Sequence, residues 1–442
     1  MKKILSISII MLAMFAGNTF AQKTLTLTEA ISVALNQNTS LIKSKNSIRT
    51  QEAAVKSAYG SFLPSISAGG SWSWQRTNDN GGSQLNYFGE EEATAASEED
   101  SRSFSLSANS SITLFDGLSS FAKLSQTKNS SEAAKYDLEQ LRQDVVYQTA
   151  NLFFSVISYD KLLKYQEENY KYNENLLQKI SEMNELKMNP ISDVYSQEVQ
   201  TANSESDLLQ AQNNFEKAKI SLLDYLSLDI NQEYTFEAPS KESDSQYINE
   251  PIEQLYETAL ANRKDYQSQK LTLESANDQL TIANAGYLPS LNGSFNFSTS
   301  ALTLGNLFSR RVLGAGISLN VPVFSGWSTD YSVQSAKVQI ENSNEDLRNL
   351  ERTIKSDVKN VMLDLQTAKK QVEVTNKAIQ SAQESWKVKK ESYSLGKITY
   401  IDLQSSYKDL LQAQNNSIQA LYTYYKTNYE LMNKLGVLDT SK

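Results

Sequence analysis

Hydrophobic side chains recur every three or four residues along two very long stretches of this 442-residue chain. In the second stretch these apolar positions are Leu347, Leu350, Ile354, Val358, Val361, Leu365, Ala368, Val372, Ile379, Ala382 and Trp386. A spacing near 3.5 residues is typical of a coiled-coil seam. It predicts helices over about 118–185 and 327–394, each roughly 100 Å long at 1.5 Å per residue. A return helix follows each of them, so helical hairpins are expected at 118–228 and 327–435.

Apolar and small polar residues alternate in the segments that precede the long helices. Ile66, Ala68, Trp72 and Trp74, for example, alternate with serines. Alternation over ~10 residues is the pattern of a transmembrane barrel strand. A half-buried hairpin of a soluble protein shows the same alternation, but four such segments in two matched pairs favour the membrane interpretation. The predicted strands lie at about 62–74, 103–116, 288–299 and 311–324.

The sequence contains an internal repeat. Leu-Pro-Ser at 63–65 returns at 288–290, an offset of 225 residues. Leu-Phe-Asp-Gly at 114–117 aligns with Val-Phe-Ser-Gly at 323–326, an offset of 209 that continues without a gap through the helical hairpin. The difference between the offsets gives the first half 16 additional residues between its two blocks.

Each repeat has the order helix, strand, strand, very long helix and return helix. The first repeat spans 22–230 and the second 251–442, and the polar segment 231–250 joins them as a linker or equatorial segment. A single helix is expected to open the first repeat over roughly 28–59. The acidic loop 79–101 of the first repeat is expected to be a solvated, disordered tip.

Residues 1–21 have the features of a secretory signal peptide. Lys2 and Lys3 precede an apolar run at 4–16, and the small-x-small cleavage site ends at Ala21. This run is shorter than the ~20 residues that a membrane-spanning helix needs. We therefore expect an exported chain without a transmembrane helix.

The composition excludes several function classes. The chain has no cysteine and no histidine, which rules out disulfides, Cys- or His-ligated metals, a lipidated N-terminal cysteine, and Ser-His or Cys-His catalysis. Its net charge is −9, and no basic stripe indicates nucleic-acid binding. An enzyme that uses paired carboxylates is a further alternative, but no acidic cluster lies on a glycine-rich loop framework. We expect no enzyme, no cofactor and no metal site.

The predicted strands are too few to form a membrane barrel within one chain. Unpaired backbone groups cost several kcal/mol each in lipid, and the smallest barrels have ~8 strands. Two copies would form a barrel nearly filled by its own side chains, whereas three would supply twelve strands. The expected fold is therefore a mixed α/β membrane duct, in which a trimer forms a 12-stranded transmembrane β-barrel on a long α-helical coiled-coil barrel.

The duplicated order, the segment lengths and the motifs together resemble the outer membrane efflux protein family, of which TolC is the type. Besides the repeated motifs, Gly-Lys-Ile-Thr-Tyr-Ile-Asp-Leu at 396–403 carries the resemblance, which covers essentially all of the mature chain. It implies a homotrimer in outer-membrane lipid with its helical part in the periplasm. It also implies that the channel passively exports substrates in a tripartite efflux or type I secretion system, together with a periplasmic adaptor protein and an inner-membrane transporter.

The resemblance implies roles for residues at the helical tip. Asp402 matches the first acidic position of the family's channel constriction, while Ser405 falls on the second and is not acidic. Asp193 and Tyr393 match residues that tether the closed tip in the family. Ile398 stands at the position of the arginine in that tether, with Lys397 beside it.

The same resemblance identifies the turns that would face the adaptor. These are Lys187, Met188, Asn189 and Pro190 in the first hairpin and Gly396, Lys397 and Ile398 in the second. Lys187 stands where the family has a glycine that matches Gly396, which puts the adaptor contact at the first hairpin in question.

Two physical interpretations remain for the acids at the tip. Three copies of Asp402 around an axis would attract cations into a pore. Alternatively, Asp193 and Asp402 are first-turn acids that stabilise helix N-termini. The alternative for the whole chain is a periplasmic coiled-coil adaptor or scaffold without a channel, which requires the alternating segments to form a soluble sheet.

Overall fold

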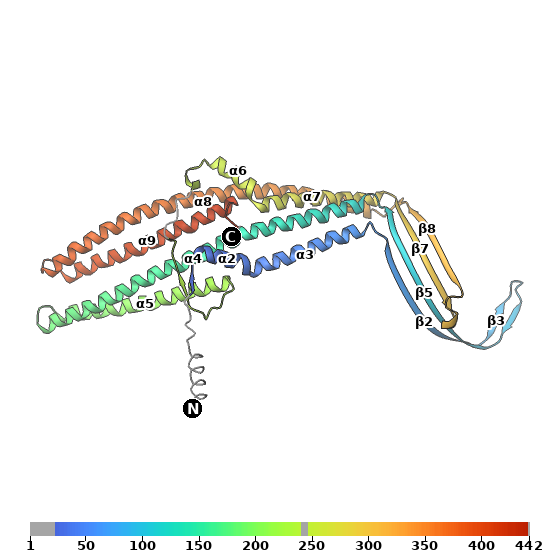
Figure 1. Ribbon diagram of the computed structural model, residues 1–442, viewed down its shortest axis with the longest axis horizontal. Coiled ribbons are helices and arrows are strands. Elements are labelled where there is room, and N and C mark those ends of the chain that lie inside the picture. Colours follow the sequence, from blue (N-terminus) through green and yellow to red (C-terminus); the bar gives the residue numbers. More distant parts are fainter. Residues whose placement is uncertain (1–22, 240–245, 441–442) are drawn as a thin grey trace, which may run out of the picture. The chain divides into compact units, whose positions relative to one another are not determined.

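The computed structural model describes residues 23–239 and 246–440 (Figure 1). The predicted signal peptide lies outside the described residues. Within these ranges, no helix has an apolar stretch long enough to cross a bilayer. The helices of the first repeat are α2 (Leu27–Gln37), α3 (Thr39–Gly60), α4 (Ser119–Glu185) and α5 (Ile191–Tyr225). Those of the second are α6 (Ile252–Asn262), α7 (Lys264–Asn284), α8 (Ser328–Ser394) and α9 (Tyr400–Leu435).

The helix predicted over 28–59 is in fact two helices, because the chain breaks at Asn38. This residue leaves the helical region with φ −60° and ψ 124°. Its side-chain Oδ1 accepts hydrogen bonds from the backbone N–H groups of Ser40 (2.9 Å) and Leu41 (3.4 Å), and so caps α3. The second repeat breaks at Arg263, the equivalent position at the offset of 225.

The two repeats share their backbone turns. Helices α4 and α8 each have 67 residues, and they begin 209 residues apart. Left-handed backbone conformations recur at the same offset, although the residue types differ in three of the four pairs. The equivalent pairs are Gly117 and Gly326, Leu118 and Trp327, Lys187 and Gly396, and Ser227 and Gly436.

One antiparallel sheet combines strands of both repeats. Its order is β2 (Ser65–Asp79), β5 (Ser97–Phe115), β7 (Ser290–Ala301) and β8 (Arg311–Asn320). The pairing of β5 with β7 joins the repeats, with Ala108 opposite Phe297. Among the described strands, none pairs with the outer edge of β2 or of β8.

The acidic loop of the first repeat is ordered strand, so the expectation of a disordered tip was wrong. Strands β2 and β5 stay paired as far as Asp79 opposite Ser97. Beyond them, β3 (Gly82–Leu85) and β4 (Glu91–Thr94) form a further hairpin. The Arg76 guanidinium bridges the strands to Asp100 (2.8 Å) and Glu98 (3.3 Å). Cross-strand ion pairs and backbone pairing therefore order a segment that has no apolar alternation.

The segment between the repeats contributes one short strand. Strand β6 (Tyr234–Phe236) pairs in parallel with β1 (Lys23–Leu25), near the start of the described chain. A short 3₁₀ turn at Gln246–Asn249 then leads into α6. The linker is thereby fixed to the first repeat by main-chain hydrogen bonds.

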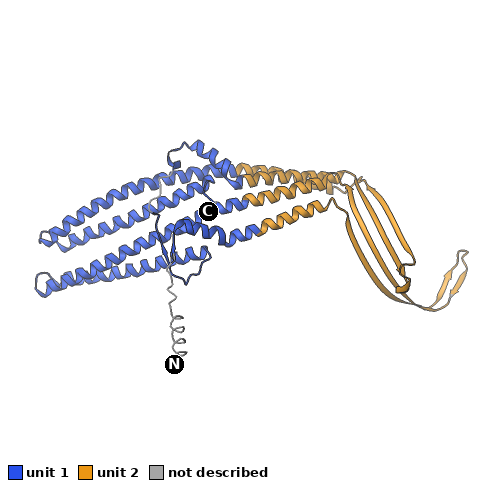
Figure 2. Ribbon diagram, viewed as in Figure 1, with its two compact units in different colours: residues 1–45, 137–266, 350–442 blue, residues 46–136, 267–349 orange. Residues whose placement is uncertain are grey.

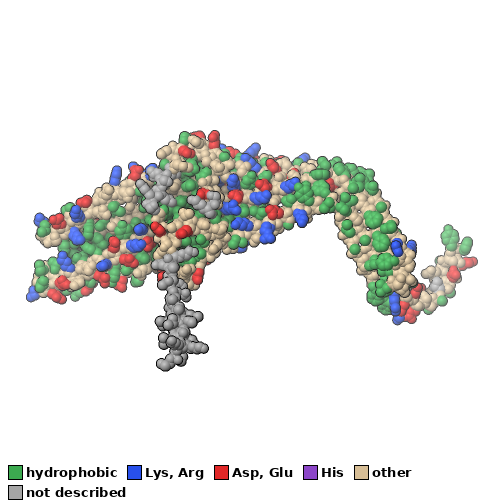
Figure 3. Space-filling view, viewed as in Figure 1, with side chains coloured by type: hydrophobic (Ala, Val, Ile, Leu, Met, Phe, Trp, Pro, Cys, Tyr) green, Lys and Arg blue, Asp and Glu red, His purple; other side chains and the backbone are tan. Residues whose placement is uncertain are grey.

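The chain divides into two compact units that cut across both repeats (Figure 2). Unit 1 comprises 1–45, 137–266 and 350–442, and unit 2 comprises 46–136 and 267–349. In unit 1, α6 packs on α8 and α9 through buried side chains that include Leu255, Ile354, Leu365 and Leu431. Unit 2 contains the sheet, whose surface in Figure 3 is rich in hydrophobic side chains, whereas charged side chains are scattered over the helices.

Candidate functional site

The first candidate feature is the turn between α4 and α5 in unit 1. Lys187 adopts a left-handed conformation with φ +58°. Its N–H donates to Asn184 O (2.8 Å), and the N–H of Met188 donates to Met183 O (2.9 Å). This is the Schellman pattern that satisfies the last carbonyl groups of a helix. The Asn184 side chain also donates to the carbonyl of Asn189 (2.8 Å), which fixes the turn before Pro190.

The turn between α8 and α9 has the same geometry. Gly396 is left-handed with φ +69°, and its N–H donates to Tyr393 O (2.9 Å). The N–H of Lys397 donates to Ser392 O (2.9 Å). Ile398 is half-buried, while Lys397 is exposed. The hairpin turns are thus equivalent in backbone although only one of them contains glycine.

Large apolar side chains are exposed at and beside both turns. They are Leu186, Met188 and Ile191 in the first hairpin and Leu395 and Ile401 in the second. Leu186 and Leu395 are equivalent at the offset of 209. Both hairpin ends thus expose large apolar side chains to solvent.

Asp402 caps the helix that it begins. Its carboxylate accepts hydrogen bonds from the Thr399 hydroxyl (2.6 Å) and backbone N–H (3.1 Å), while its own N–H donates to the Thr399 hydroxyl (3.2 Å). This is a capping box. The bonds from Thr399 lower the pKa of the Asp402 carboxyl below its usual range. The side chain stays exposed and charged, so capping leaves it available to a pore.

Asp193 lies in the first turn of α5 and makes no capping bond, since Pro190 occupies the N-cap position. Burial raises the pKa of the Tyr393 hydroxyl, and the negative charge of Asp193 raises it further. The predicted tether residues Asp193 and Tyr393 are therefore close enough to interact. Lys397 forms no ion pair with any described residue of this protomer.

A buried polar network links the two hairpins, and sequence reasoning missed it. Gln197 is fully buried, and its Nε2 donates to the backbone O and Oδ1 of Asn173, both at 3.1 Å. Its Oε1 accepts from the hydroxyl of Tyr400 and from Nε2 of Gln404 (3.1 Å). Asn173 is on α4 and Gln197 on α5, whereas Tyr400 and Gln404 are on α9. One glutamine thus holds three helices together.

A sequence signal for this network existed. Val194, Gln197, Thr201 and Ser204 step by three, four and three residues, which is the spacing of a coiled-coil seam. Beside them, Leu176, Ile180, Val194 and Tyr400 form a small apolar cluster. A glutamine in seam register between apolar neighbours is a candidate for burial with partners.

A polar groove of about 700 Å³ lies next to the network, between α4, α5 and α9. Most of its lining side chains carry amides or hydroxyls, including Asn169, Asn173, Gln404 and Ser405. The predicted constriction residue Ser405 lines this groove, whereas Asp402 does not. Across the described ranges, acidic side chains form no group of three that could hold a metal ion.

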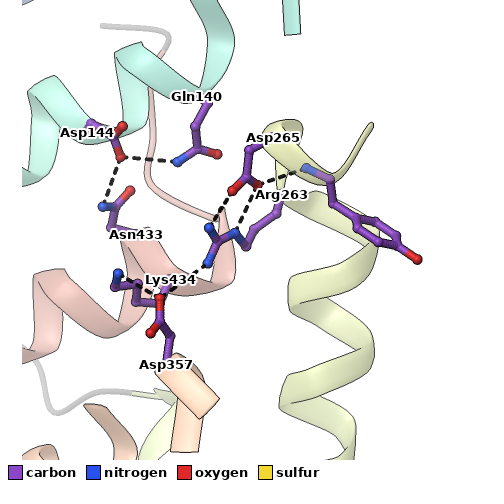
Figure 4. A network of polar contacts seen from close by, with 8 residues as sticks. Gln140, Asp144, Arg263, Asp265, Asp357, Asn433 and Lys434 are labelled. Atoms are coloured by element: carbon purple, nitrogen blue, oxygen red, sulfur yellow. Dashed lines mark hydrogen bonds and ion pairs between the residues drawn. The ribbon is translucent and has the colours of Figure 1, made fainter. Parts of the chain in front are cut away.

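A charged network lies where α6 and α7 meet α8 and α9 (Figure 4). Arg263 is almost fully buried and forms an ion pair with Asp265, and its Nη1 lies 3.9 Å from Asp357 Oδ2. Lys434 donates to the same Asp357 oxygen (3.0 Å). Arg263 Nη1 has no hydrogen-bond partner among the described residues. One guanidinium nitrogen of Arg263 therefore lacks an acceptor.

The chain belongs to the outer membrane efflux protein family, whose model matches residues 30–228 and 255–437. This is a family of transport channels and not of enzymes. The two matched segments correspond to the two repeats. No curated protein gives a significant match to the chain.

Solved structures with the same fold come from outer-membrane channels. The Campylobacter jejuni CmeC outer membrane channel shares 18% sequence identity with a TM-score of 0.80, over 94% of this chain and 87% of that chain. The outer membrane protein VceC from Vibrio cholerae shares 17% with a TM-score of 0.77, over 93% and 96%. The open state of the Neisseria gonorrhoeae MtrE channel shares 17% with a TM-score of 0.75, over 94% and 91%. The fold class predicted from the sequence is thereby confirmed.

Proposed function

We propose that this protein is the outer-membrane channel of a tripartite efflux or type I secretion system. Substrates delivered by an inner-membrane transporter and a periplasmic adaptor pass through it without chemical change. The observation that carries this proposal is the family match over both repeats, together with a fold that 94% of the chain shares with a known channel. No cofactor is required, because the inner-membrane partner supplies the energy.

The open sheet supports an assembly of three copies in the outer membrane. The free edges of β2 and β8 carry backbone groups that must find partners in lipid. Every residue of β2 is exposed in the single chain, as is nearly every residue of β8. Three copies joined β8 to β2 give twelve strands, and the exposed apolar side chains of the sheet then face lipid.

The helical tip supports docking of the adaptor in the periplasm. Leu186, Met188 and Leu395 are exposed at turns whose backbone is fixed by Schellman hydrogen bonds. The left-handed conformation of Lys187 preserves the turn that glycine provides elsewhere. Both turns, 187–190 and 396–398, therefore present an equivalent backbone to the adaptor, with exposed apolar side chains in or beside them.

The scaffold alternative has less support. A soluble sheet would bury one face, but no described segment covers β2 or β8. Planar-bilayer recording of the purified mature protein tests the channel directly. Discrete ion-conducting steps are expected. A protein that stays soluble without detergent and produces no steps is instead the scaffold.

A further inference from the structure

The segment that joins β7 to β8 carries two arginines without an acidic partner. Arg310 and Arg311 are the only charged residues between Asp278 and Asp330. Both are exposed, and neither forms an ion pair with any residue that the structure describes. Within the described chain, the side chain of Arg311 donates one hydrogen bond, from Nε to the carbonyl oxygen of Phe308 (3.1 Å). Its two terminal nitrogens are therefore available to an anion.

The backbone that carries these arginines is fixed by hydrogen bonds. Thr299 is buried on β7, and its hydroxyl donates to the carbonyl oxygens of Arg310 (2.8 Å) and Leu307. Arg311 is the first residue of β8 and pairs with Thr299 across the sheet. The two guanidinium groups therefore extend from a defined point at the end of the sheet.

Arg311 belongs to the apolar face of the sheet. Paired residues of an antiparallel ladder share a face, and successive residues alternate between the two faces. Leu313 pairs with Phe297 and Ile317 with Gly293, so these residues lie on the face of Arg311. Leu313 is 68% exposed and Ile317 is 73% exposed, while the opposite face carries mostly serine, asparagine and glycine. In the proposed channel this apolar face contacts lipid.

The position of Arg311 along the strand corresponds to the edge of a membrane. Leu319, on the same face, is eight residues further along β8, which is about 27 Å at ~3.4 Å per residue. A strand tilt of ~35–45° reduces this length to roughly 20 Å along the membrane normal, close to the ~25 Å apolar band of such barrels. The arginine lies at the end of the sheet that is away from α7 and α8 (Figure 1). With the helices in the periplasm, this end is at the outer leaflet.

The first repeat differs from the second in the charges at this end of the sheet. Arg102 on β5 is the counterpart of Arg311, 209 residues earlier. Two residues before it, Asp100 forms an ion pair with Arg76 (2.8 Å). The position equivalent to Asp100 at the offset of 209 is Ser309, which carries no charge. The second repeat thus keeps the arginine and lacks the carboxylate, so it supplies no counter-ion of its own.

We propose that Arg310 and Arg311 bind the phosphate group of an outer-leaflet lipid, whose acyl chains lie along Leu313 and Ile317. A guanidinium group donates two parallel hydrogen bonds to a phosphate, and its alkyl stem lies on apolar surface while the charged head stays at the interface. The exposed ring of Phe308 adds an aromatic side chain of the kind found at membrane boundaries. The inference rests on the proposed function, because it takes the apolar face of the sheet to contact lipid.

The combination of charge and apolar surface favours a lipid over a free anion. A free phosphate ion would use the two arginines and leave the apolar residues beside them uncovered. A phosphorylated amphiphile such as lipid A, which carries phosphate groups and several acyl chains, would occupy both. The occupant is therefore a phosphorylated lipid of the outer leaflet, and free phosphate is the alternative that the experiment has to separate from it.

Titration with lipid A tests the site. The mature protein in non-ionic detergent is mixed with increasing lipid A, and the lipids retained per protein are counted by native mass spectrometry. Arg310→Gln with Arg311→Gln is expected to weaken retention about tenfold or more, because the charge-assisted hydrogen bonds to phosphate are lost. The matched control, Arg49→Gln with Arg348→Gln, removes the same charge from exposed positions on α3 and α8 and should retain lipid A like the wild type. Equal retention by wild type and the first double variant overturns the inference.

Two further arms identify the source of the phosphate. Leu313→Ser leaves both arginines in place and should also weaken retention of lipid A, because the acyl chains lose apolar surface. Inorganic phosphate at the same concentration should not displace lipid A from the wild type. Displacement by inorganic phosphate, together with full retention by Leu313→Ser, would make the site one for a free anion and would overturn the lipid assignment.

Bilayer recording of the same samples separates this inference from the proposed function. A wild-type protein that conducts, but retains lipid A no better than the arginine variant, overturns the lipid site and leaves the channel standing. A protein that retains lipid A through these arginines but never conducts overturns the channel and leaves the lipid site standing. Conduction by the arginine variant shows that it is folded, so that its loss of lipid A reports on the site itself.

Discussion

Lys187 and Gly396 hold the same left-handed backbone conformation at equivalent ends of the two longest helices. The first has φ +58° and the second +69°, and both close a Schellman turn. A lysine in this conformation brings its Cβ close to the following carbonyl oxygen, which glycine avoids. The repeated turn is therefore retained in the first hairpin at an energetic cost.

Replacing Lys187 by glycine should stabilise the first hairpin. The left-handed conformation costs a residue with a side chain about 1 kcal/mol, and glycine removes this cost. We expect the apparent Tm of the purified protein to rise with Lys187→Gly. Gly396→Ala is the matched control and should lower the Tm by introducing the same strain. A lower Tm for Lys187→Gly would contradict this explanation of the turn.

Replacing Gln197 by leucine should loosen the contact between the hairpins. The change removes the buried acceptor of the Tyr400 hydroxyl and the buried Nε2 donor to the Asn173 side chain, at a cost of about 1–3 kcal/mol. Hydrogen exchange of backbone amides in 187–200 and 395–405 should become faster. Gln212→Leu, at an exposed glutamine of the same helix, should leave this exchange unchanged. Equal exchange in the wild type and in Gln197→Leu would show that the network does not hold the tip.

Removing the charge of Asp402 should reduce the preference of the channel for cations. Asp402→Asn keeps an oxygen acceptor for the Thr399 N–H but removes the negative charge. We expect weaker cation selectivity and weaker block by divalent cations in bilayer recordings. An unchanged current–voltage relation would rule out a constriction role.

Thr399→Val separates the charge of Asp402 from its capping role. It removes the hydroxyl from the capping box while Asp402 stays ionised. Thermal stability should fall and cation selectivity should persist. A loss of selectivity in this variant would mean that the capping geometry, and not the carboxylate charge alone, determines conduction.

Alkaline pH should destabilise the helical unit through Tyr225. Burial and the nearby charge of Asp144 raise the pKa of the Tyr225 hydroxyl to about 12, from an ordinary value of about 10. The folded state therefore holds this proton more tightly than the unfolded state does. The resulting stability is complete below about pH 10 and is lost as the pH rises toward 12. Tyr225→Phe should show a smaller loss of stability over this window in denaturant titrations, and an identical loss would exclude Tyr225 as the cause.

The internal repeat, with its offset of 209 residues, predicted much of the helical architecture. It placed two long helices at 118–185 and 327–394, and the structure has them at 119–185 and 328–394. This prediction rested on a coiled-coil seam that occurs once in each repeat, and neither 118–185 nor 327–394 contains a proline. The mixed α/β duct followed from the combination of this seam with the alternating strands.

Other features depend on contacts that periodicity does not encode. Asn38 ends one helix and caps the next with its side chain, although the sequence pattern over 28–59 predicts one continuous helix. Strand β6 has three residues and is defined by its pairing with β1, about 210 positions earlier. Gln197 lies in seam register, but the sequence alone did not reveal Tyr400 and Gln404 opposite it. In each case the partner lies far along the chain or is a backbone group.

Imaging in detergent can show whether several copies of this chain form a hollow duct. The mature protein extracted from membranes is viewed by negative stain and averaged without imposed symmetry. Tapered hollow cylinders with threefold averages and a helical portion of roughly 100 Å are expected. Thin solid rods, or particles that disperse without detergent, would contradict a channel built from several copies and would favour the scaffold.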